Sequence, residues 1–265
     1  GAPTDLTPKE FFKAIVSVSN ELSNINFTKI IFPINQFVNK LITEQAATSY
    51  LVRALVDQGY IINSLKTQNK SKPANFQVYL QTNKPATKEI KQGLKNGQAI
   101  SKGVSLTKDL GNLPPNICTP TYLANSAKKL ARAYKMKVTV LEQKQIDKLK
   151  MGSFLAVAKG SREAPKFIII EHNKGPKNKK PIVLVGKGIT FDAGGISIKP
   201  STDMDEMKYD MGGAATVLGV MKTVGELNLP LNIIMVVPTC ENLPDGNAVK
   251  PGDIVTSMSG QTIEV

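Results

Sequence analysis

The sequence predicts an α/β protein with mixed sheets flanked by helices. Short runs rich in β-branched residues alternate along the chain with longer segments of helical periodicity. Three of these runs, 167–170, 182–185 and 233–237, are almost continuously apolar, which is typical of central strands covered on both faces. Apolar residues make up 41% of the 265 positions, enough to form the core of one large domain or of two ordinary ones. We therefore expect a sheet with helices on both sides.

The first third of the chain predicts two helices and two strands. Thr7 and Glu10 have the spacing of a capping box, and apolar residues follow them at helical spacing. A short apolar strand is expected over 30–32. A second helix is expected over about 38–65, where leucines and isoleucines keep the helical period. The alternating segment 76–80 predicts another strand.

A third helix is expected over about 87–109 and ends before a double proline at 114–115, which rules out further helix there. The next helix begins at the Thr-Pro pair of 119–120 and ends near residue 134. A strand is then expected over 138–141. We place a domain boundary near the double proline, with the third helix as the connector.

The chain is basic, with 34 Lys and Arg against 21 Asp and Glu, so a nucleic-acid partner has to be considered. The lysines are scattered, however. Their densest group, within 174–180, lies among Asn, Gly and Pro between two apolar runs, which is typical of a solvated loop. No helix-turn-helix, zinc-finger or aromatic-rich RNA-binding motif accompanies it.

The two cysteines, Cys118 and Cys240, lie far apart in the sequence. Their number and spacing argue against a secreted disulfide scaffold and against a cysteine zinc site, so we expect both to be reduced and buried. The first residues have neither the basic start nor the apolar stretch of a signal peptide, and no run of about 18 apolar residues occurs. These features predict a cytoplasmic protein without a membrane span.

The segment 185–200 contains the most informative group of polar residues. It follows a predicted buried strand, at the sheet edge where α/β proteins bind ligands. Four glycines between 186 and 195 allow the backbone to turn tightly and to approach a ligand. Lys187, Asp192 and Lys199 lie among or beside these glycines. A second acidic cluster ends at Asp210, directly before the small residues that open another helix.

Several kinds of chemistry use such residues. A phosphate-binding P-loop is disfavoured because Lys187 is followed by Gly-Ile rather than by Ser or Thr, and the dinucleotide fingerprint lacks a glycine. A Ser–His–Asp triad is disfavoured because the one histidine, His172, ends an apolar strand before a basic loop. A Ser–Lys hydrolase that uses Ser197 or Ser201 with Lys199 stays open on residue type alone.

A two-metal hydrolase accounts for more of these residues. Aspartates supply hard oxygen ligands, and one carboxylate can bridge two divalent ions. Lysine is a ligand only when neutral, and lowering its pKa from about 10.4 to about 7 costs roughly 4–5 kcal/mol. Burial beside two dications would oppose the ammonium form and favour the neutral amine. A second, charged lysine would stabilise the oxyanion that forms during hydrolysis.

The segment 185–211 resembles the metal-site segment of the leucyl aminopeptidase (cytosol aminopeptidase) family. The likeness is specific because five motifs occur in the family's order and spacing: Gly-Lys-Gly, Thr-Phe-Asp-Ala-Gly-Gly, Ser-Ile-Lys-Pro, Met-Asp-Glu-Met-Lys-Tyr-Asp-Met-Gly-Gly and Cys-Glu-Asn. It covers the chain from about Lys108 onward and includes 110–116, 155–160, 248–253 and 258–262.

The resemblance implies a two-metal-dependent aminopeptidase that releases N-terminal leucine and similar residues from peptides. Lys187, Asp192 and Asp210 would be metal ligands, with Asp192 bridging two divalent ions, Mn or Zn, in each subunit. Lys199 would be the charged catalytic residue that also binds the substrate carbonyl. Met207 would form a wall of the pocket for the first side chain of the peptide.

The resemblance also implies a domain plan: the remainder of a small N-terminal α/β domain over 1–86, a connecting helix over 87–110, and the N-terminal part of a zinc-exopeptidase-like catalytic domain over 111–265. The family forms homohexamers. Its members carry further strands before the equivalent of Thr7. Their Asn-Thr-Asp-Ala-Glu-Gly-Arg signature follows the equivalent of 261–265, and it supplies the last metal ligands and an arginine that holds bicarbonate.

We therefore expect a fragment truncated at both ends. By itself it would not hydrolyse leucine p-nitroanilide with added Mn or Zn. The alternatives are a nucleic-acid-binding protein and an inactive structural homologue, each with the same fold.

Overall fold

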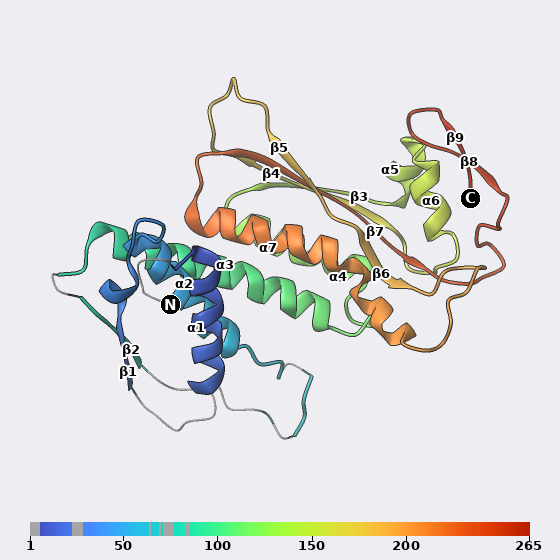
Figure 1. The fold of residues 1–265 in the computed structure, drawn as a ribbon. Coiled ribbons are helices and arrows are strands. Elements are labelled where there is room, and N and C mark those ends of the chain that lie inside the picture. The colour runs from blue at the N-terminus through green and yellow to red at the C-terminus, as the bar shows by residue number, and fades with distance from the viewer. Residues whose placement is uncertain (1–5, 23–28, 64, 69, 71–76, 83–84) are drawn as a thin grey trace. The chain divides into compact units, whose positions relative to one another are not determined.

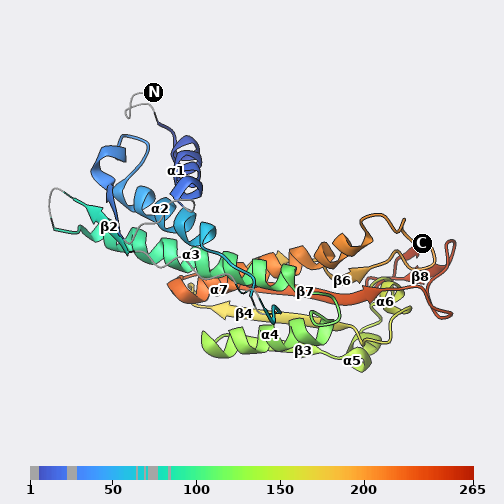
Figure 2. The same cartoon turned by 90° about the horizontal axis from the view of Figure 1, so that it is seen from below.

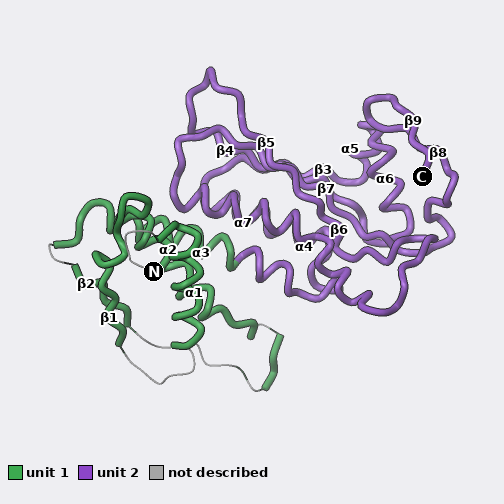
Figure 3. Tube along the Cα trace, viewed as in Figure 1, with its two compact units in different colours: residues 1–105 green, residues 106–265 purple. Residues whose placement is uncertain are grey.

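A computed structural model describes residues 6–22, 29–63, 65–68, 70, 77–82 and 85–265. The chain divides into two compact units, residues 1–105 and 106–265 (Figure 3), and each is described by itself. The long helix α3 (Lys88–Asn112) runs through the boundary. It ends slightly later than predicted, because Gly111 and Asn112 still belong to its last turn.

Unit 1 places two helices and α3 beside a two-stranded parallel sheet (Figure 1). The helix α1 opens as predicted, because the Thr7 amide donates to Glu10 (3.0 Å) and the Glu10 amide to Thr7 Oγ1 (3.3 Å). A core that includes Phe11, Ile34 and Leu51 joins the elements. The elements before α3 are α1 (Pro8–Leu22), β1 (Lys29–Pro33), η2 (Ile34–Phe37), α2 (Glu44–Gln58) and β2 (Gln77–Gln81).

The helix predicted over 38–65 is shorter than expected. Asn39 accepts hydrogen bonds from the backbone amides of Leu41 and Ile42 (2.8 and 2.9 Å), which turns the chain before the helix begins. Thr43 then caps α2 by accepting from the Ala46 amide (3.1 Å). The prediction failed because the exposed Leu41 matches the helical period without belonging to the buried face.

Unit 2 contains a five-stranded mixed sheet with strand order β3-β4-β7-β5, in which β6 also pairs with β7. β3, β4 and β7 are antiparallel neighbours, whereas β5 and β6 run parallel to β7. The elements are α4 (Pro120–Ala133), β3 (Lys137–Leu141), α5 (Gln143–Lys148), α6 (Gly152–Ala158), β4 (Lys166–Asn173), β5 (Ile182–Val185), β6 (Gly188–Asp192), η3 (Met204–Met211), α7 (Gly212–Leu227), β7 (Asn232–Asn242), β8 (Ile254–Thr256) and β9 (Thr262–Glu264).

One face of this sheet carries the main core of the unit. Ile168 and Ile170 of β4 and Met235 of β7 are fully buried against α4 and α7. Figure 2 shows these two helices side by side along the sheet. Burial alternates along β4 and β7, so their side chains on the other face are only half-buried. The prediction that these strands are covered on both faces is therefore met only in part, because one face is buried and the other is half-buried.

The prediction for 182–185 needs a further correction. Among the described residues, β5 lies at the end of the strand order. Three of its four apolar side chains are between 53% and 69% exposed: Ile182, Val183 and Val185. A continuously apolar run does not reveal how many neighbours its strand has, because pairing partners come from distant parts of the chain.

Among the described residues, no helix combines the length and apolarity that crossing a bilayer requires.

Candidate metal centre

The position of Lys187 follows from a break between two strands. β5 and β6 continue along the same side of β7 in one register, with Val185 opposite Val236 and Gly188 opposite Thr239. The Gly186 amide donates to Val236 (2.9 Å). In a parallel ladder the Gly186 carbonyl would next accept from residue 238, but Pro238 has no N–H. The pairing is therefore interrupted at Gly186 and Lys187.

Asp192 lies at the end of β6, directly after a bulge. Ile189 pairs with Cys240 and Asp192 with Asn242, so β6 has one more residue than β7 over this stretch. Such a bulge changes the direction in which the following side chain points. Gly194 and Gly195 then adopt positive φ values of 93° and 71°, which turn the chain away from the sheet. Asp192 is 8% exposed at this turn.

The structure brings the five predicted site residues together. Lys187 Nζ lies 3.0 Å from Asp210 Oδ1, and Lys199 Nζ lies 3.2 Å from Asp192 Oδ2. Lys199 Nζ also lies 3.1 Å from Met207 Sδ. Asp210 and Met207 belong to η3, which packs against β6. The two aspartates are close enough for each to affect the pKa of the other.

The pKa values of the two carboxyl groups are shifted in opposite directions. Burial acts to raise the pKa of Asp192, but the neighbouring Asp210 and the hydrogen bonds from the Gly194 amide and Asn242 outweigh it and lower the pKa. Burial also raises the pKa of Asp210, and nearby Asp192 adds to this increase against the opposing effect of Lys187. A carboxylate only accepts hydrogen bonds, so this pair interacts favourably only through a shared proton or a shared cation.

These residues fit a divalent cation. Asp210 Oδ2 is buried and has no hydrogen-bond partner. The neighbouring ammonium groups do not enclose the carboxylates, since the Lys187 and Lys199 side chains are 58% and 37% exposed. Carboxylate oxygens are the ligands that hard cations prefer. Within the described part of the chain, no group of three or more His, Cys, Asp or Glu side chains is suited to a metal. The ligands available here are thus two carboxylates and a lysine amine.

The alternative nucleophilic sites lack the necessary contacts. Among the described residues, the hydrogen-bonding and ion-pair partners of Lys199 Nζ are Asp192 and Met207, not Ser197 or Ser201. His172 is buried, and its Nε2 lies 2.8 Å from the Leu229 carbonyl oxygen. It therefore has a structural position on the helix-covered face of the sheet.

The family profile described as "Cytosol aminopeptidase family, catalytic domain" matches residues 105–265, which is more than half of the chain. The chain belongs to the cytosol aminopeptidase family. The family predicted from the motifs around Asp192 is thereby confirmed.

Curated relatives of the cytosol aminopeptidase family match the whole chain or a large part of it. A "Probable cytosol aminopeptidase" of Herminiimonas arsenicoxydans is 48% identical over 268 residues, covering 100% of this chain and 53% of the relative. Another of Ralstonia nicotianae is 64% identical over 169 residues, covering 64% of this chain and 33% of the relative. The chain spans about half the length of the first of these relatives.

Solved structures share the fold of this chain. The bottromycin maturation enzyme BotP has a TM-score of 0.82 and 25% identity, covering 99% of this chain and 54% of that protein. A structure of BotP described as a complex with Mn has a TM-score of 0.81 and 27% identity, covering 98% and 53%. The predicted α/β fold class is confirmed.

Asn242 has a role in this centre that the sequence did not indicate. Its motif, Cys-Glu-Asn, supported the family resemblance, but no function was predicted for Asn242 itself. In the structure it ends β7 directly opposite Asp192 and donates its side-chain amide to Asp192 Oδ1 (2.8 Å). The strand was predicted to end at residue 237, whereas β7 continues to Asn242, so the pairing of Asn242 with Asp192 was not foreseen.

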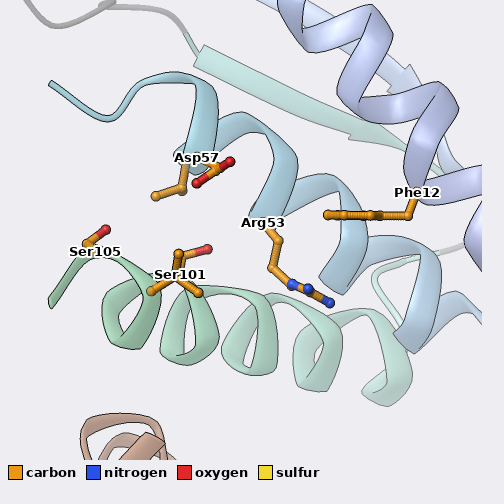
Figure 4. A pocket seen from close by; sticks show the side chains of 7 residues that line it. Phe12, Arg53, Asp57, Ser101 and Ser105 are labelled. Atoms are coloured by element: carbon orange, nitrogen blue, oxygen red, sulfur yellow. The ribbon is translucent and has the colours of Figure 1, made fainter. Parts of the chain in front are cut away.

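A separate cavity of 120 Å³ lies in unit 1 (Figure 4). The Arg53 guanidinium lies 4.8 Å from the centre of the Phe12 ring, and Ser101 and Ser105 line the side formed by α3. None of the five predicted site residues belongs to this cavity.

Proposed function

We propose that the full-length protein is a two-metal-dependent aminopeptidase that releases N-terminal residues, leucine and similar ones, from peptides. The observation that carries this proposal is a pair of carboxyl groups, the buried Asp192 and the partly buried Asp210, each paired with a lysine. The names of the relatives support peptide substrates, and the Mn complex of BotP supports a divalent cation.

In this proposal Lys187, Asp192 and Asp210 would hold the two cations. The cations, Mn or Zn, would polarise the scissile carbonyl and make the attacking water more acidic. The buried, unpartnered Oδ2 of Asp210 is an oxygen available for this role. Lys187 already lies within 3.0 Å of Asp210, so its amine and that carboxylate can reach the same ion.

Lys199 is the proposed catalytic and substrate-binding residue. Asp192 and Met207 hold its ammonium beside the carboxyl groups, where the peptide carbonyl would lie. A fixed positive charge at that point would donate a hydrogen bond to the carbonyl oxygen and stabilise the oxyanion. Met207 would line the pocket for the first side chain, since its flexible thioether adapts to apolar groups.

The remaining parts of the proposal concern the whole protein. We propose an N-terminal α/β domain over 1–86, a connecting helix over 87–110 and a catalytic domain that begins at 111. We also propose a homohexamer located in the cytoplasm, with bicarbonate as a further group in the complete site. The names of the relatives support the location, and none of the relatives described above is named as a nucleic-acid-binding protein.

The experiment uses the full-length protein, stripped of metal with a chelator and then supplied with Mn or Zn. We expect hydrolysis of leucine p-nitroanilide only after metal is added, and a loss of at least about 100-fold for Asp192→Asn. Asp205→Asn, which changes an exposed aspartate of η3, is the matched control and should keep the activity. Turnover by the metal-free protein, or by Asp192→Asn at the wild-type rate, would contradict the proposal.

A further inference from the structure

Asn242 and Asp192 are joined through both backbone and side chain. They are partners across β6 and β7 at the point where the two strands end. The Ala193 amide donates to the Asn242 carbonyl (2.8 Å), and the Asn242 side-chain amide donates to Asp192 Oδ1 (2.8 Å). The backbone bond places Asn242 beside Asp192, and it does not depend on the side chain at position 242.

The side-chain bond determines how the Asp192 carboxylate is oriented. Oδ1 accepts two hydrogen bonds, one from Asn242 and one from the Gly194 amide (2.9 Å). Oδ2 lies 3.2 Å from Lys199 Nζ. Because a carboxylate cannot donate, the amide nitrogen of Asn242 must face it, and two donors on one oxygen restrict rotation about the Cβ–Cγ bond.

The amide of Asn242 is itself held in place. Gly195 passes so close that a Cβ at this position would lie 2.9 Å from Asn242 Oδ1. The amide is therefore enclosed between the glycine turn on one side and Asp192 on the other. This arrangement leaves the side chain little freedom to turn away from the carboxylate.

We propose that Asn242 is a positioning residue for the metal centre. It holds the Asp192 carboxylate so that Oδ2 faces the space shared with Lys199 and Asp210. The inference rests on the proposed function, because the orientation matters only if Asp192 binds cations. Partners that orient a metal ligand typically contribute about 10–100-fold to metal affinity, so removal of the Asn242 amide should weaken metal binding by this factor.

The test measures Mn binding to the metal-free full-length protein by isothermal titration calorimetry and by the EPR spectrum of the bound Mn. Asn242→Leu keeps the branched shape of the side chain and removes the donor, while Asn242→Ser is a shorter side chain whose hydroxyl cannot reach Asp192 in place of the amide. The matched control is Asn232→Leu. Asn232 lies in the same strand, and its amide donates to the carbonyl oxygens of Pro176 and Lys179 (2.8 and 3.0 Å), away from the site.

We expect either Asn242 variant to bind Mn about 10–100-fold more weakly with an altered EPR spectrum, while Asn232→Leu keeps the wild-type values. Thermal melting of all variants separates this effect from a general loss of stability. A folded Asn242 variant with wild-type Mn affinity and spectrum overturns the inference and leaves the proposed function standing. If Asp192→Asn binds Mn as tightly as the wild type, the proposed function itself fails.

Discussion

The backbone amide of Ala214 donates a 2.8 Å hydrogen bond to the carbonyl oxygen of Lys187. This bond joins the first turn of α7 to the strand break that carries the Lys187 side chain. The approach requires a glycine next to Ala214, since a Cβ on Gly213 would lie 2.8 Å from Lys187 N and 3.1 Å from Lys187 O. The position of the lysine backbone thus depends on close packing of the helix start.

The close approach predicts that an alanine at Gly213 and an alanine at Gly212 change the stability of the protein differently. Gly213→Ala should destabilise the protein by about 1–3 kcal/mol, because the methyl group meets backbone atoms that cannot move freely. Gly212→Ala is the matched control, since a Cβ there meets nothing within 4 Å. It should be neutral or slightly stabilising, because alanine favours helix. Thermal unfolding measures both, and equal melting temperatures for the two variants would contradict the close-packing argument.

Replacement of Lys199 should affect catalysis more than metal binding. In the proposed mechanism its charge stabilises the oxyanion, so Lys199→Met should lower kcat by about 10²–10³ without weakening Mn binding. Lys208→Met is a suitable control, because Lys208 Nζ lies over the Tyr209 ring (4.9 Å) and not at the carboxyl groups. Steady-state kinetics of the full-length protein, combined with Mn titration, tests this. If Lys199→Met mainly lowered the affinity for Mn instead, this would indicate that Lys199 is a metal ligand.

The two cysteines should be unreactive in the folded protein. Cys118 and Cys240 are free and buried, and burial raises the pKa of each thiol to about 12. The reactive thiolate is therefore scarce at pH 8. We expect negligible reaction with a thiol reagent under native conditions and full reaction of both after unfolding in denaturant. Rapid labelling of the native protein would show that one of these side chains is accessible.

The contact between Tyr134 and Glu226 predicts a pH dependence of stability. Burial, together with the 2.6 Å hydrogen bond to Glu226, raises the pKa of Tyr134 from 10.0 to about 12. A raised pKa means that the contribution to stability is complete below pH 10 and is lost as the pH rises toward 12.

Tyr134→Phe should therefore be less stable than the wild type by about 1 kcal/mol at pH 8. The gap should close toward pH 12. Denaturant unfolding at several pH values tests this, and a gap that stays constant up to pH 12 would refute the assignment.

Local sequence signals predicted the helices well where the relevant bonds are short-range. Two helix starts could be predicted, the capping box of Thr7 and Glu10 and the Thr119-Pro120 pair. In each, the groups that interact lie within one turn of each other. The same kind of signal failed over 38–65, where the side chain of Asn39 competes for backbone amides and the periodic leucines do not mark a buried face.

The sequence by itself determined the family and predicted a set of five site residues, because their motifs are local and lie within one segment, 187–210. Only the tertiary structure decided which lysine pairs with which aspartate and that Asn242 reaches Asp192. These relationships depend on the pairing of β6 with β7, including its bulge and the missing N–H of Pro238. Such pairing joins residues that are far apart in the chain, so no local sequence pattern predicts it.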